Sequence, residues 1–415
     1  MRVESITPIN YGDLIQPGQI HGALYTDPGI YEQELDRIFH KGWVFVAHES
    51  EVPNPGDYVT RTVGRQSYIV ARDKSGKVQV LLNRCQHRGN LLCNRPHGKA
   101  KVLTCPYHGW TYGLDGQVLD IPYAGGFNRP WEEMALERPR HDSYRGFLFA
   151  SLDPDGITLA EHLGLATELI DRSCDLSPQG EIELSAGWLR HRYYANWKML
   201  PENDTDGYHV NFTHQSFVRA IDSQYDHFVS DEASVKGLIR DWGNGHTEID
   251  FAPGYKQPLD WLGTSPDKVR GWVQSLEQAY GKTRAEEIMW QGPPHACIWP
   301  NLFLGEMNIV IFQPLGVSES VQWHTPMFLK GAPELNYRLL RQSEGALGAA
   351  SFLVAEDCSI AERTQQALDS GQPWLDLSRG LEREEQDARG VRVSHMSDET
   401  SNRGFWRHYE QVMTA

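Results

Sequence analysis

Two cysteines and two histidines in the first third of the chain have the residue types and the spacing of a metal site. Cys85 and His87 form a C-x-H half, and Cys105 and His108 form a C-x-x-H half, with 17 residues between the halves. Two thiolates and two imidazoles are a donor set for tetrahedral zinc. The same set binds a [2Fe–2S] cluster in which cysteines hold one iron and histidines the other.

The composition of each half favours the iron–sulfur cluster. Structural zinc sites more often combine a C-x-x-C half with an H-x(3–5)-H half. Here each half supplies one cysteine and one histidine, so two similar loops would hold a cluster from either side. Gly89 and Gly109 let the backbone approach the sulfurs without a side chain in the way. The residues therefore favour a Rieske-type cluster, and a zinc site remains the alternative.

A second group of candidate ligands lies between Glu202 and His214, in the segment E-N-D-T-D-G-Y-H-V-N-F-T-H. His209 and His214, with one carboxylate from elsewhere, would form the 2-His-1-carboxylate site of non-haem Fe(II), which leaves positions open for O2 and substrate. Residues five apart on a regular helix are rotated by about 140°, so the imidazoles share a face only if the helix widens or breaks. Asp206, three residues before His209, would lie on its side of a helix and accept the imidazole N–H.

Together the two segments resemble the large (α) subunits of the aromatic-ring-hydroxylating oxygenases, and the likeness covers most of the chain. It rests on C-Q-H-R-G from Cys85, on C-P-Y-H-G-W from Cys105, and on the iron motif E-N-(x)-D-x-Y-H-x(4)-H. Glu202 to His214 match that motif after the N-W-K lead-in that begins at Asn196. The resemblance implies a Rieske [2Fe–2S] cluster and a mononuclear non-haem Fe(II), with O2 as co-substrate.

The third iron ligand must come from a distant carboxylate. The residues alone do not choose it from 55 acidic side chains. The resemblance points to Asp357, and Glu356 and Glu362 in the same late segment are the alternatives.

Offsets from these ligands nominate residues for a substrate pocket. Asn203 is the candidate polar group close to the iron, and Arg219 is the only basic residue nominated to contact the substrate. The candidate apolar walls are Val210, Phe217, Leu347 and Leu353.

The elements that must position these residues belong to an α+β protein. Helical spacing predicts a helix over 27–39, and the late segment predicts one long helix over 344–368. Short alternating runs predict strands, and so do longer apolar runs farther along the chain. The expected strands lie at 57–63, 66–71, 78–83, 297–307 and 310–314.

Three regions follow from this pattern and from the resemblance. We expect an N-terminal segment, 1–42, packed with the catalytic domain, and a small antiparallel β Rieske domain at 43–155. We expect a larger catalytic domain at 156–415, for which the resemblance implies a helix-grip-like fold, an antiparallel sheet with helices.

Length and charge exclude several classes of protein. A chain of 415 residues with 40% hydrophobic content is long enough for two folded domains. The net charge of −16 argues against nucleic acid or an anionic membrane as a partner. No stretch reaches the roughly 20 apolar residues of a spanning helix, and the start shows no secretory signal. Six cysteines are few for this length, and the four outside the metal motif, Cys93, Cys174, Cys297 and Cys358, are scattered, which suits a reducing cytoplasm.

The sequence contains no G-x-G-x-x-G opening a helix and no P-loop, so NAD(P)H is expected to act only through a separate reductase, with or without a ferredoxin. The resemblance implies an α3 trimer or an α3β3 assembly with a small β subunit, in which Asp206 links His209 to His108 of the partner subunit. We predict cis-dihydroxylation or ring hydroxylation of an aromatic substrate, with a monocyclic aromatic acid preferred. The alternatives are an O- or N-demethylating monooxygenase, a non-catalytic electron carrier and a structural zinc protein.

Overall fold

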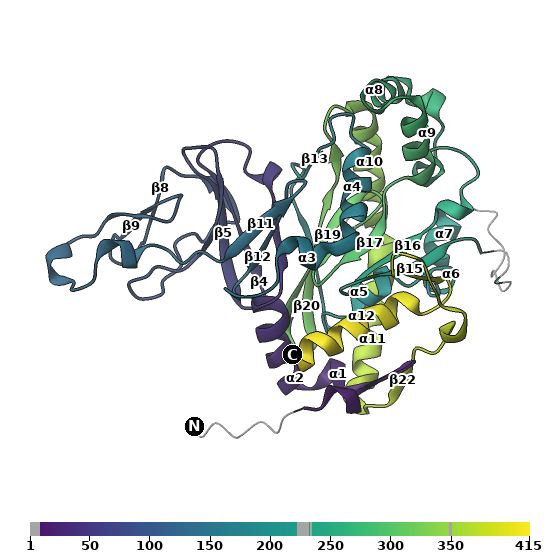
Figure 1. Cartoon of the computed structure of the whole chain (residues 1–415), viewed down its shortest axis with the longest axis horizontal. Coiled ribbons are helices and arrows are strands. Elements are labelled where there is room, and N and C mark those ends of the chain that lie inside the picture. The colour runs from purple at the N-terminus through teal and green to yellow at the C-terminus, as the bar shows by residue number, and fades with distance from the viewer. Residues whose placement is uncertain (1–8, 222–231, 233–234, 348–350) are drawn as a thin grey trace. The chain divides into compact units, whose positions relative to one another are not determined.

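The computed structural model describes residues 9–221, 232, 235–347 and 351–415, and it separates into two compact units. One unit is Phe39–Leu159, and the other joins the segment up to Ile38 to Ala160–Ala415. Both units are mixed or mainly β structures built on antiparallel sheets, as the α+β prediction requires (Figure 1). No helix in the described part of the chain is long and apolar enough to cross a membrane.

The unit Phe39–Leu159 consists of three small antiparallel sheets. The strands expected at 57–63, 66–71 and 78–83 are confirmed to within a residue at each end. The first sheet has the order β6-β5-β4-β7, the second β10-β9-β8 and the third β11-β12-β3. The bounds are β3 Val44–His48, β4 Asp57–Val63, β5 Gln66–Arg72, β6 Val78–Leu82, β7 His97–Lys99, β8 Val102–Thr104, β9 Thr111–Gly113, β10 Val118–Asp120, β11 Arg140–Tyr144 and β12 Phe147–Ser151.

The larger unit is centred on a nine-stranded antiparallel sheet with the order β14-β20-β19-β18-β17-β16-β15-β24-β23. The apolar runs expected to form strands near 297–307 and 310–314 lie in its middle, as β17, β18 and β19. The bounds are β14 Leu189–Tyr193, β15 Leu238–Gly243, β16 His246–Asp250, β17 His295–Ile298, β18 Leu302–Leu304, β19 Asn308–Gly316, β20 Glu319–Pro326, β23 Glu385–Gln386 and β24 Arg392–His395.

Helices pack around this sheet and carry most of the candidate iron ligands. Helix α12 contacts β15 and β16, and α11 contacts α1, α5, α6, α7 and α10. The main helices are α1 Ala23–Thr26, α2 Pro28–Glu34, α4 Thr167–Asp175, α5 Met199–Asp204, α6 Val210–Thr213, α7 Gln215–Ile221, α8 Arg270–Tyr280, α9 Lys282–Gln291, α10 Pro333–Leu347, α11 Phe352–Ser370 and α12 Thr400–Thr414.

The single long helix expected over 344–368 is wrong, because two helices share that range. Helix α10 ends at Leu347, and α11 begins at Phe352. Ser351 has an extended backbone, with φ −75° and ψ 140°, and its hydroxyl accepts the N–H of Leu353. A serine N-cap of this kind starts a new helix rather than continuing the previous one.

The helix expected over 27–39 is confirmed as α2 followed by a π-helical turn, Leu35–His40. Its last α-helical residue, Glu34, is buried and binds the lead-in to the iron motif. Lys198 Nζ donates to Glu34 at 2.5 Å, and the Trp197 indole N–H donates to it at 2.8 Å. A buried ion pair of this kind is stable because both charges have hydrogen-bond partners, so it fixes where the chain enters α5.

Candidate metal centres and an adjoining cavity

The two loops that carry Cys85 and Cys105 have the same backbone hydrogen-bond pattern. In each loop the cysteine carbonyl accepts the N–H of the glycine four residues later, Gly89 at 2.9 Å and Gly109 at 3.1 Å. The cysteine N–H donates to the carbonyl five residues later, at 2.9 and 2.8 Å. Both glycines have positive φ, 74° and 76°, a region that favours glycine. Two equivalent turns therefore present one cysteine and one histidine each.

The four candidate donors differ in exposure. Cys85 and Cys105 are each 2% exposed, within an apolar core, whereas His87 and His108 are half-buried. The Nδ1 atoms of the two imidazoles lie 3.1 Å apart. Burial raises the pKa of the Cys85 thiol, and the neighbouring Cys105 adds to this rise. Two buried thiols beside each other and two ring nitrogens facing each other fit a cluster with cysteines on one iron and histidines on the other.

Aromatic side chains surround these donors. His87 stacks on Trp110, with ring centroids 5.1 Å apart, and His108 stacks on Tyr107 at 3.8 Å. Tyr112 on β9, which the sequence analysis did not single out, places its hydroxyl 3.3 Å from Cys85 Sγ. That oxygen accepts the backbone N–H of Gln86 at 3.2 Å, so its own hydrogen is free to donate to the sulfur. In the sequence, the sign that Tyr112 could take part in the site was its position in the same short segment as the ligands.

The iron motif folds as two short helices with a break at the second histidine. His209 is the N-cap residue of the four-residue helix α6, and His214 is its C-cap residue, where α7 begins anew. The expectation that a regular helix cannot serve both histidines is therefore confirmed. The break turns both imidazoles toward one point, with their Nε2 atoms 3.2 Å apart.

Asp357 on α11 completes a triangle of donor atoms. Its Oδ1 lies 3.6 Å from His209 Nε2 and 3.3 Å from His214 Nε2. Three cis ligands at about 2.1 Å from an octahedral metal are separated by about 3 Å. Asp357 Oδ1 is buried and has no hydrogen-bond partner among the described residues. The donor set and the orphaned oxygen fit a divalent iron, and this is the only such group of three found in the described chain.

The two alternative carboxylates lie elsewhere. Glu356 Oε2 is 3.0 Å from Nδ1 of His214, on the side of the ring away from Asp357, and the Ser216 hydroxyl donates to Glu356. Glu362 accepts the backbone N–H of Tyr194 at 2.9 Å. Glu356 therefore orients a histidine, as carboxylates beside metal ligands commonly do.

Asp206 lies close to His209, but the predicted hydrogen bond is not formed, because His209 Nδ1 has no hydrogen-bond partner among the described residues. The helical offset to His209 is wrong, because α5 ends at Asp204 and Asp206 lies in the loop before α6. Its Oδ2 is nevertheless 3.5 Å from His209 Nδ1, and the Tyr208 N–H fixes its other oxygen at 2.6 Å. Burial alone would lower the pKa of His209, but the carboxylates of Asp206 and Asp357 outweigh it and raise that pKa.

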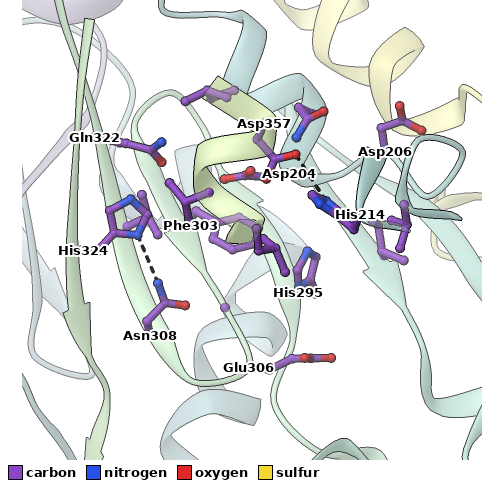
Figure 2. A pocket seen from close by; sticks show the side chains of 18 of the residues that line it. Asp204, Asp206, His214, His295, Phe303, Glu306, Asn308, Gln322, His324 and Asp357 are labelled. Carbon is purple, nitrogen blue, oxygen red and sulfur yellow. Dashed lines mark hydrogen bonds and ion pairs between the residues drawn. The ribbon is translucent and has the colours of Figure 1, made fainter. Parts of the chain in front are cut away.

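A cavity of about 210 Å³ adjoins the three donors (Figure 2). Its wall is mostly apolar, with carboxyl, amide and imidazole groups at intervals. The lining residues are Leu200, Asn203, Asp204, Asp206, His209, Val210, His214, Ile249, Phe251, His295, Phe303, Gly305, Glu306, Met307, Asn308, Val310, Gln322, His324, Leu353, Val354 and Asp357.

Only some of the residues nominated for the substrate pocket line the cavity. Val210 and Leu353 line the cavity, and so does Asn203, whose side chain hydrogen-bonds Asp357. Phe217 and Arg219 do not line it, and Arg219 is exposed. Both residues were nominated on the assumption that one helix continues beyond the iron motif, whereas a new helix, α7, begins after His214. Leu347 ends α10, and its side chain lies outside the described part of the structure.

Sequence reasoning missed six polar lining residues: Asp204, His295, Glu306, Asn308, Gln322 and His324. Burial raises the pKa of Glu306 to about 7 and that of Asp204 well above its usual value. Burial also lowers the pKa of His295 to about 4 and that of His324 to about 3, so both imidazoles are neutral. Asp204 lay inside the iron motif, and Glu306 was the one acid in an apolar run. Both signals were available.

Comparisons with known proteins agree with this geometry. The Rieske [2Fe-2S] domain model matches residues 42–130, and the model "Ring hydroxylating alpha subunit (catalytic domain)" matches residues 181–415. The 2-halobenzoate 1,2-dioxygenase large subunit of Burkholderia cepacia is 31% identical over 373 residues, which cover 86% of this chain and 79% of the relative. The anthranilate 1,2-dioxygenase large subunit of Acinetobacter baylyi is 31% identical over 376 residues, with the same coverage. A naphthalene 1,2-dioxygenase variant bound to phenanthrene matches with a TM-score of 0.84 and 25% identity, covering 98% of this chain and 96% of that one.

Proposed function

This chain belongs to the ring-hydroxylating oxygenase alpha subunits, with a Rieske [2Fe–2S] domain, and from that membership we propose that it oxygenates a monocyclic aromatic acid. The observation that carries the proposal is the triangle of His209, His214 and Asp357 at the wall of an apolar cavity. Such a donor set would leave positions of a bound iron free for O2 and substrate.

Each metal group has its own residues. Cys85 and Cys105 would hold one iron of the cluster, and His87 and His108 would hold the other. His209, His214 and Asp357 would hold the mononuclear iron. When bound, the two groups supply single-electron transfer and the activation of O2.

The chain's other residues orient the iron ligands and keep water out. Glu356 holds the His214 imidazole by its Nδ1 atom, which keeps Nε2 directed at the metal position, and the Asp206 carboxylate lies 3.5 Å from Nδ1 of His209. Asn203 hydrogen-bonds Asp357. Val210 and Leu353 supply apolar wall, which favours a ring over water next to the ligands.

The size of the cavity supports a single-ring substrate. A cavity of roughly 150 Å³ accommodates one benzene molecule, so about 210 Å³ suits one ring with small substituents. Two relatives are named for single-ring acids, 2-halobenzoate and anthranilate.

Electrons come from NAD(P)H through a separate reductase, with or without a ferredoxin. The active assembly is a trimer of this chain, with or without a small β subunit, in which Asp206 also reaches His108 of the partner subunit. The enzyme works in the cytoplasm, where a reducing environment keeps the four cysteines outside the cluster as free thiols.

The test is oxygen incorporation with a reductase and NADH supplied. The purified protein is incubated with benzoate, anthranilate and 2-halobenzoates under labelled O2, and products are analysed by mass spectrometry. Two labelled atoms in one product identify dioxygenation, and one identifies monohydroxylation. Asp357→Ala is the matched control and should give neither. Failure to label any ring while the cluster is reduced would contradict the proposal.

A further inference from the structure

Glu306 places a carboxyl group in the cavity, at a point the iron site does not use. It lies in the turn between β18 and β19, which the Gly305 N–H closes by donating to the carbonyl of Asn308 at 2.8 Å. Glu306 is half-buried, and its side chain lines the cavity together with Met307. In Figure 2, Glu306 lies well away from Asp357, at the other end of the drawn pocket.

The carboxyl of Glu306 has little to bind within the protein. Its one hydrogen-bond partner in the described part of the chain is the Tyr255 hydroxyl, 3.5 Å away, which is the outer limit of a hydrogen bond. Two other buried acids in the same unit are better partnered: Glu34 binds Lys198 at 2.5 Å, and Glu202 accepts bonds of 2.9 Å from tyrosine and tryptophan. Burying a carboxyl without such partners costs free energy, so its position calls for a function.

The charges around the cavity narrow the choice of ligand. The described lining includes the carboxyl groups of Asp204, Asp206, Glu306 and Asp357, and neither lysine nor arginine. A ligand group beside Glu306 therefore meets an acceptor rather than a cation. The group that satisfies such an acceptor is an N–H or O–H donor.

We propose that Glu306 selects substrates whose aromatic ring carries a hydrogen-bond donor, an amino or hydroxyl group. This inference rests on the proposed function, because it assigns the cavity to the ring that is oxygenated. With the reacting edge of the ring at the metal end, a donor on the far side faces Glu306. A ring without a donor leaves the carboxyl desolvated and unpaired, so the site rejects it more strongly than a purely apolar pocket would.

Two variants of Glu306 and one variant of its neighbour Met307 distinguish substrate selection by Glu306 from a purely structural role. Glu306→Leu removes the acceptor, Glu306→Gln keeps an amide oxygen in nearly the same place, and Met307→Leu changes the adjacent wall without changing polarity. Binding of benzoate and of 2-, 3- and 4-aminobenzoate and the matching hydroxybenzoates is measured by calorimetry on the intact protein. The visible spectrum of the cluster and the unfolding midpoint of each variant report whether it is folded.

We expect the wild-type protein to bind at least one amino- or hydroxybenzoate about 10-fold or more tighter than benzoate. Glu306→Leu should weaken binding of that ligand by about 10- to 100-fold, the range for a lost hydrogen bond to a carboxylate. The same variant should strengthen benzoate binding, because no unpaired carboxyl is then desolvated by the ring. Glu306→Gln should recover most of the loss, and Met307→Leu should keep the wild-type preference. Equal wild-type affinity for all the rings, or equal losses for benzoate and its amino derivative in Glu306→Leu, would overturn the inference. The proposed function fails separately, if no ring gains labelled oxygen.

Discussion

Replacing Tyr112 with phenylalanine should lower the reduction potential of the cluster. The Tyr112 hydroxyl lies 3.3 Å from Cys85 Sγ and is itself held by the Gln86 N–H at 3.2 Å, so its hydrogen points to the sulfur. A hydrogen bond to sulfur stabilises the reduced cluster more than the oxidised one, because reduction puts more negative charge on the sulfur. Loss of that bond therefore makes reduction harder.

The size of the change follows from the free energy of one buried hydrogen bond. Tyr112 is fully buried, so water cannot replace its hydroxyl without rearrangement. A net contribution of about 0.5–1.5 kcal/mol corresponds to roughly 20–60 mV for a one-electron couple, for which 59 mV is a tenfold change in equilibrium constant. We expect a fall of that size.

Potentiometric titration monitored by visible absorption measures the midpoint directly. Tyr68→Phe is the control, because Tyr68 is buried in the same unit and its hydroxyl has no hydrogen-bond partner in the described structure. It should leave the potential unchanged. If Tyr112→Phe has the wild-type midpoint, or if both variants shift equally, the reasoning about the sulfur bond is wrong.

Three further predictions concern the iron site and the cavity. Asp206→Asn should keep both metal groups but slow reoxidation of the pre-reduced cluster by about 10- to 100-fold. A carboxylate can accept an N–H at each of its two oxygens, whereas an amide can accept only at its single oxygen. An unchanged reoxidation rate in stopped-flow measurements would refute this prediction. Glu356→Ala should weaken iron binding by about 10- to 100-fold by freeing Nδ1 of His214, and a chelator competition with the wild-type constant would count against it. Burial raises the pKa of Glu306 from 4.5 to about 7, so the folded protein keeps a proton that the unfolded chain has released, and stability falls as the pH rises through that window. Glu306→Gln should therefore be more stable than the wild type above pH 7, by up to about 3 kcal/mol, and coincident urea curves near pH 8 would exclude it.

The cluster residues could be predicted because their geometry is local. Each half of the motif closes its own turn by hydrogen bonds between residues four and five apart, and Gly89 and Gly109 mark both turns. The third iron ligand depends on packing instead. Asp357 reaches the histidines only because α11 contacts α6 and α7, and the residues alone gave no preference over Glu356 and Glu362.

Arguments from regular helical spacing were less reliable near the iron motif. Helical spacing required a break between His209 and His214, and that break is present. Phe217 and Arg219, however, were nominated as pocket residues on the assumption of a continuous helix, and neither lines the cavity. Glu306 could not be assigned from its spacing, because its role comes from a turn between two strands of the sheet. A single acid within an apolar run was the only sign of it in the sequence.

Iron and acid-labile sulfide analysis of the wild-type protein and of Asp357→Ala tests whether the chain holds a [2Fe–2S] cluster and a separate mononuclear iron. We expect about three irons and two sulfides per chain in the wild type, with two irons in the cluster and one at the mononuclear site. The variant should keep two irons, two sulfides and the wild-type cluster spectrum. Stoichiometric zinc without labile sulfide, or three irons retained in Asp357→Ala, would contradict the account.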